Sequence, residues 1–196
     1  MRRLTAGLLC LPLVVGVASL SVGAESEPIS LTVMIQSLSV TVSPATKDFG
    51  TVIAGSSDNL TTGAVDITND GNVAQRLQLD ITTAPAWTSV VGAPGNEEYR
   101  LSCLFKSSQV VGGDFDKTTG VGDTEDDILV DGTAETCVGY NSGSPGDDNF
   151  ATADNEDGHD MAVSDVHHLY FNFDAPSATS TTSQETIAVT ITAIAM

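Results

Sequence analysis

The regular alternation of apolar and polar side chains along residues 65–81 constrains the fold of this chain more than any other feature. Val65 and Ile67 alternate with Asp66 and Thr68 in the first half of the segment. After a short polar interruption the spacing resumes, and one face then carries Val73, Gln75, Leu77, Leu79 and Ile81. A period of two is typical of a β-strand with one buried face. The segment therefore predicts two strands joined by a tight turn.

The turn between these strands, residues 69–72, has the composition of a hairpin loop. A two-residue loop would place Ile67 opposite Ala74 and set apolar against polar side chains. A three-residue loop, residues 69–71, places Ile67 opposite Val73 and aligns the apolar faces. That loop needs a left-handed residue at its third position, which Gly71 supplies. We therefore predict a β-hairpin with a bulge at Gly71.

Other runs of the sequence also have the period of two. Residues 29–42 predict a long first strand with a change of phase at residues 36–37, and residues 186–195 predict the last one. Between them we expect strands near residues 49–53, 87–91, 99–105, 128–130, 136–140 and 167–173. No segment of useful length has a helical period. Short strands with frequent turn signals predict an all-β fold, an immunoglobulin-like or jelly-roll β-sandwich, with one long acidic loop insertion at about residues 107–160.

A short motif adds a family resemblance over about residues 44–83. The pattern Asp48-Phe49-Gly50-x-Val52-x-x-Gly55, followed by Val65-x-Ile67-x-Asn69-x-Gly71, resembles the ASH or choice-of-anchor type of immunoglobulin-like domain found in secreted bacterial proteins. This resemblance implies a β-sandwich used for adhesion, scaffolding or surface display, generally without catalysis. The acidic, Gly-rich insertion departs from the family pattern.

Residues 1–24 have the organisation of a secretory signal peptide. Arg2 and Arg3 precede an apolar core at residues 8–17, and Val22-Gly23-Ala24 resembles a cleavage site. The apolar core is shorter than the roughly 20 residues that span a bilayer. We therefore expect export by the general secretion route, no membrane insertion after cleavage, and a single mature domain at residues 25–196. The expected location is the medium or the cell surface, with the periplasm as an alternative.

The strongly negative charge of the chain excludes anionic partners. Removal of the signal peptide leaves five basic residues against 26 acidic ones, a net charge of −21. Nucleic acid and anionic membrane surfaces would repel such a chain. A saline or cation-rich medium, or a basic partner, would suit it.

Two cysteines remain in the mature chain, Cys103 and Cys137. An even number in an exported protein favours a disulfide. On the chain-entropy description, a bond closing this loop would stabilise the fold by about 3–4 kcal/mol.

The acidic loops present candidate calcium ligands, because calcium takes six to eight oxygen ligands. An EF-hand spacing fails, since Gly158 as the sixth position would put Ala153 first. His159, His167 and His168 match no standard zinc spacing. Calcium bound by irregular loops and a purely solvated acidic surface remain as alternatives. The candidate ligands are Asp123, Glu125, Asp126, Asp127, Asp154, Glu156 and Asp157.

No residue is assigned a catalytic role, because neither a Gly-x-Ser-x-Gly elbow nor a phosphate-binding loop occurs. The sequence favours a non-enzymatic exported structural or surface protein with no cofactor other than calcium. Its terminal strands, residues 29–42 and 186–195, would allow self-association into a fibre or surface layer by strand addition. The alternative is an extracellular β-sandwich module that binds calcium or carbohydrate through its insertion loops.

Overall fold

The computed structural model describes residues 32–82, 84–117, 127–139, 150–151 and 156–196. The chain divides into two compact units, residues 1–34 and 35–196. In the first unit only residues 32–34 are described, and they are exposed. The described part of the second unit is all-β, as predicted, with strands and one short 3-10 turn, η1 (Gly112–Asp114).

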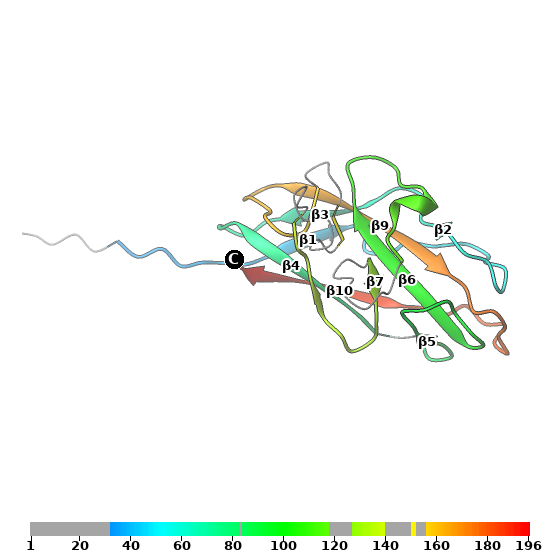
Figure 1. Cartoon of the computed structure of the whole chain (residues 1–196). Coiled ribbons are helices and arrows are strands. Elements are labelled where there is room, and N and C mark those ends of the chain that lie inside the picture. Colours follow the sequence, from blue (N-terminus) through cyan, green and yellow to red (C-terminus); the bar gives the residue numbers. More distant parts are fainter. Residues whose placement is uncertain (1–31, 83, 118–126, 140–149, 152–155) are drawn as a thin grey trace, which may run out of the picture. The chain divides into compact units, whose positions relative to one another are not determined.

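Two sheets make up the second unit (Figure 1). The larger sheet has β9 (Val166–Asp174) at its centre and contains the long strand β6 (Glu98–Phe105). Its strand order is β1 (Val40–Ser43), β3 (Val65–Asn69), β9, β6 and β5 (Thr88–Ser89), while β2 (Asn59–Leu60) also pairs with β9 and β7 (Ile128–Leu129) with β6. The smaller sheet has the order β10 (Ala188–Ala195), β4 (Gln75–Thr82) and β8 (Glu135–Thr136). All of these pairs are antiparallel except β5 with β6.

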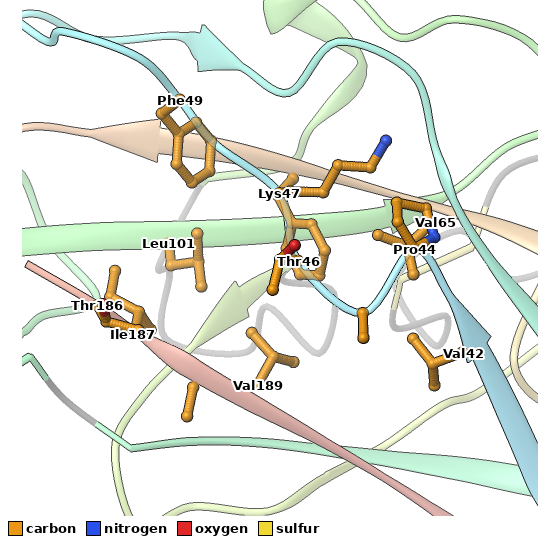
Figure 2. A pocket seen from close by; sticks show the side chains of 13 residues that line it. Val42, Pro44, Thr46, Lys47, Phe49, Val65, Leu101, Thr186, Ile187 and Val189 are labelled. Carbon is orange, nitrogen blue, oxygen red and sulfur yellow. The ribbon is translucent and has the colours of Figure 1, made fainter.

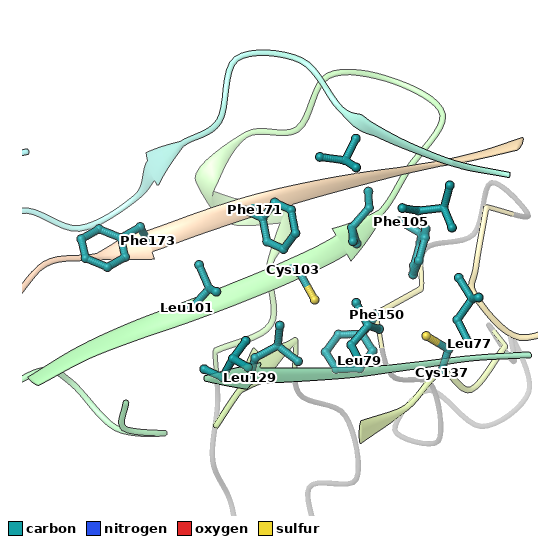
Figure 3. Close-up of a cluster of buried hydrophobic side chains, with 14 of the residues drawn as sticks. Leu77, Leu79, Leu101, Cys103, Phe105, Leu129, Cys137, Phe150, Phe171 and Phe173 are labelled. Atoms are coloured by element: carbon teal, nitrogen blue, oxygen red, sulfur yellow. The ribbon is translucent and has the colours of Figure 1, made fainter. Parts of the chain in front are cut away.

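The hydrophobic core lies between the two sheets, because both sheets contribute to one buried cluster (Figure 3). The predicted alternation is confirmed on the strands that form it. The side chains that enter the main core are Leu77, Leu79 and Ile81 from β4, Tyr99, Leu101, Cys103 and Phe105 from β6, and Leu169, Phe171 and Phe173 from β9. Burying one large aliphatic or aromatic side chain contributes about 1.5–3 kcal/mol, so this cluster is the main source of stability.

The predicted hairpin at residues 69–71 is wrong. β3 pairs with β1 and β9, whereas β4 pairs with β10 and β8 in the other sheet. The chain therefore crosses from sheet to sheet, and the apolar faces of β3 and β4 both point into the core between the sheets. Gly71 is not left-handed. It is needed because a Cβ atom there would lie 2.4 Å from the Ser37 carbonyl oxygen.

Asn69 organises this crossing. Its buried side-chain amide donates hydrogen bonds to the carbonyl oxygens of Val73, Met161 and Ala162 at 2.8–3.1 Å. Its side-chain oxygen accepts one from the Gly71 N–H at 3.0 Å. The amide thus ties the turn to the chain that leads into β9, and it satisfies its own hydrogen-bonding groups inside the core.

Within the described residues the first strand is shorter than predicted, because Val40–Ser43 alone pairs as β1, and residues 29–31 of the prediction lie outside them. Residues 35–39 bind instead to Asn72 and Gln75, mainly through the side chains of these two residues, and the Ser37 carbonyl also accepts from the Asn72 backbone N–H. The amide of Asn72 donates to the Ile35 carbonyl and accepts from the Ser37 N–H, and the amide of Gln75 bridges the backbone of Ser39. The strand predicted at residues 49–53 is also not formed. Phe49 packs there against Phe173, with ring centroids 5.3 Å apart.

The insertion is partly structural, not a loop appended to the fold. Val110 and Phe115 pack on Leu104 and Tyr170, on the face of the larger sheet that points away from the main core. Residues beyond them supply β7, β8 and the buried ring of Phe150. This cover explains why Tyr170, Asn172 and Asp174 are buried, although the alternation along β9 predicts them on an outward face.

Candidate interaction groove and polar clusters

A groove opens where the two sheets end side by side. β1 is the last strand of the larger sheet and β10 is the last strand of the smaller one. Within the described part of the chain, no strand pairs with the outer edge of either. Edge strands present unpaired N–H and C=O groups, which makes them sites for the addition of another strand.

Apolar side chains line this groove, which has a volume of about 350 Å³ (Figure 2). Its floor is the core itself, through Val65, Leu101 and Phe171. Its walls come from residues 42–49 on one side and 186–189 on the other. The only charged lining residue is Lys47, whose Nζ donates to the Thr62 carbonyl at 3.2 Å. The groove can hold an apolar, extended segment.

The predicted calcium ligands are only partly described, since Asp123, Glu125, Asp126 and Asp154 lie outside the described residues. Asp127 is buried, and its carboxylate accepts from the Asp116 N–H at 2.8 Å. Asp157 accepts hydrogen bonds from the backbone N–H groups of His159 and Asp160. No group of three acidic, histidine or cysteine side chains suited to a metal ion occurs among the described residues.

Glu156, the remaining candidate, binds a histidine. Its carboxylate accepts a hydrogen bond from the backbone N–H of His168 and lies 2.8 Å from Nδ1 of the His168 ring. His167 points to the other face of β9, where its Nδ1 contacts the Asp157 carbonyl. The two neighbouring histidines therefore point to opposite faces of β9, as successive residues of a strand do.

A buried ion cluster was not predicted from the sequence. The Asp174 carboxylate, only 3% exposed, lies 2.5 Å from Nη2 of Arg100 and 2.9 Å from Nζ of Lys117. Asp58 joins it, with its backbone N–H donating to Asp174 and its carboxylate 2.8 Å from Lys117. Burial disfavours the charge on Asp174, but these hydrogen bonds and cations outweigh it and lower the pKa of that carboxyl. The cluster joins β9, β6 and the insertion, so we assign it a structural role.

The predicted disulfide between Cys103 and Cys137 is not formed in the structure. Both side chains are buried as thiols in the main core. Cys137 packs against Gly158, where a Cβ atom would lie 2.5 Å from its Sγ. Burial, followed by the charge of Asp157, raises the pKa of the Cys137 thiol, so the thiolate needed for reaction is suppressed.

Gly158→Ala is expected to destabilise the fold by about 1–3 kcal/mol, because the added methyl overlaps buried atoms. The contacts are the Sγ and Cβ of Cys137 and the ring of Phe105. Urea unfolding followed by fluorescence would measure the loss. Cys137→Ala opens space at the same point, so the double variant is expected to lose less than the two single losses together. Simple additivity would contradict the contact.

Among the described residues, no helix has the length and apolar character needed to cross a membrane. Comparisons with protein-family models, with curated proteins and with solved structures yield no match for this chain. The resemblance to ASH domains therefore stays a prediction.

Proposed function

We propose that the chain is an exported, non-enzymatic structural protein whose copies associate through edge strands. The apolar groove between β1 and β10 is the observation that carries this proposal, because it is an apolar hollow beside the edge strands of both sheets. A signal peptide at residues 1–24 would deliver the protein to the medium or to the cell surface. There it would form a fibre or a surface layer.

The charge of the mature chain sets the conditions for this assembly. Copies with a net charge of −21 repel one another, and the repulsion between exposed charges falls as salt shortens the screening length to about 10 Å at 0.1 M. Apolar contacts do not weaken in the same way. Assembly of this acidic chain through apolar contacts is therefore expected to increase with ionic strength.

Purified residues 25–196 are expected to form ordered polymers at high concentration and at least 0.5 M NaCl. Size-exclusion chromatography and negative-stain microscopy would detect them. Parallel samples with calcium and with chelator, at matched ionic strength, separate screening from specific ion binding. A monomer in every condition would contradict the proposal. Polymers that require calcium at matched ionic strength would point instead to a calcium-dependent interface.

A further inference from the structure

We propose that the groove between β1 and β10 of one copy receives residues 32–38 of a second copy as an added strand. This inference rests on the proposed function and names the two surfaces that would join. It is argued from the exposure of the segment, from the composition of both surfaces and from their positions in the fold.

The segment itself is unusually exposed for its composition. Val33 is 83% exposed and Ile35 is 79% exposed, and Met34 between them is also exposed. The sequence of residues 32–38, TVMIQSL, contains no charge in a chain with 26 acidic residues. In its own molecule it belongs to no strand. A neutral segment with an exposed run of β-branched and other apolar residues has the character of a β-strand that lacks its sheet.

The groove matches that segment in chemistry and in length. Its walls and floor are mostly apolar, so the apolar side chains of Val33 and Ile35 would leave water for an apolar surface there. The β10 side of the groove is four residues long, at residues 186–189. A strand of that length directs two side chains to one face. Val33 and Ile35 are two such side chains, two residues apart.

Residues 35–38 of the segment lie at the opposite end of β10 from the groove. Residues 35–39 are held by the side chains of Asn72 and Gln75, and Gln75 pairs with Ala195 at the end of β10. The groove is formed at the other end of β10, where Ala188 pairs with Thr82. A copy therefore cannot easily fill its own groove while these bonds hold. The contact is head-to-tail, and repeating it extends a chain of subunits without closure.

The test uses full mature chains that carry one blocked surface each. Val33→Asp with Ile35→Asp puts charge on the inserted face of the segment, and Ala188→Arg puts a long cation at the exposed rim of the groove. Each variant alone is expected to remain monomeric, with at least a tenfold loss of polymer at the concentration where the unchanged chain assembles. An equimolar mixture is expected to give a heterodimer, because each variant retains one intact surface. Thermal unfolding of the monomers checks that both are folded.

Two matched controls separate the surfaces from charge alone. Thr32→Asp with Gln36→Asp adds the same charge on the other face of the segment, and Thr190→Arg adds the same cation on β10 outside the groove. Both are expected to polymerise. If the unchanged chain assembles and the blocked variants do so equally well, this inference is overturned while the proposed function stands. A mixture that forms no heterodimer, although the unchanged chain polymerises, also overturns it. If the unchanged chain never assembles, both fail.

Discussion

Replacing Asp174 by alanine is expected to lower the free energy of unfolding by about 3–5 kcal/mol, because it leaves buried cations without their partner. Arg100 and Lys117 each have 15% exposed side chains, and both lie within 3 Å of the Asp174 carboxylate. Asp58, half exposed, is the second acidic side chain that pairs with Lys117 in the described part of the chain. Urea unfolding can be followed through Trp87, whose ring centroid is 6.1 Å from that of Phe173.

Two further variants test whether the effect comes from burial of the charge. Asp58→Asn removes the same charge from a side chain that is 51% exposed, so its effect is expected to be under about 1 kcal/mol. Asp174→Asn keeps the shape and removes the charge, and its effect is expected to lie between the two. Equal losses for Asp58→Asn and Asp174→Asn would contradict a buried, charge-dependent cluster.

The same carboxylate predicts how stability depends on pH. Because the pKa of Asp174 is lowered from its ordinary value of 3.8, the folded protein binds that proton more weakly than the unfolded chain does. Its contribution is complete above about pH 4 and is lost as the pH falls through the folded pKa. The difference in stability between the unchanged chain and Asp174→Asn is therefore expected to be largest at neutral pH and to shrink in acid. If the stability difference between the two proteins increased in acid, the pKa of Asp174 would not be lowered by folding, and the proposed ion cluster would be contradicted.

The sequence predicts which face of each strand is buried more reliably than which strands are neighbours. The alternation places Leu77, Leu79 and Ile81 on one face, and all three are buried. The alternation reports the face because a side chain one position along points the other way. It carries no information on whether a turn joins two strands of one sheet or crosses between two sheets. Whether β3 and β4 form a hairpin depends on this difference. Here the crossing is held by hydrogen bonds from the Asn69 amide to Met161 and Ala162, which lie far along the chain.

The buried ion cluster could not be predicted from the sequence for a related reason. Arg100 and Asp174 meet because β6 and β9 pair with these residues directly opposite each other. Nothing local in either strand specifies that register. A polar residue that alternates with apolar ones is predicted to face solvent, and the strand alone does not show that another segment covers it. The cover comes from the insertion, through Val110 and Phe115. The apolar residues at 110 and 115 are the signal that could have identified it as more than a solvated loop.

Replacing Asn69 by aspartate is expected to destabilise the fold by about 3 kcal/mol or more at neutral pH, whereas alanine is expected to cost about 1–3 kcal/mol. The amide nitrogen faces three carbonyl oxygens, those of Val73, Met161 and Ala162. Alanine only removes the donor, but a carboxylate of the same shape places a buried negative charge against three acceptors. Chemical denaturation at pH 7 would rank the two variants.

Measuring stability at lower pH distinguishes Asn69→Asp from Asn69→Ala, because only an electrostatic penalty depends on protonation of the carboxyl. A buried carboxyl with one oxygen against three acceptors has a raised pKa, so the Asn69→Asp penalty is complete at high pH and disappears as the pH falls toward the unfolded value. Measured against the unchanged chain at each pH, Asn69→Asp is expected to recover between pH 7 and about pH 4, and Asn69→Ala is not. Asn72→Asp, at an exposed amide in the same turn, serves as the matched control with little change at any of these pH values. An aspartate variant no worse than alanine at pH 7 would mean that Asn69 does not hold the crossing between the sheets through these three bonds.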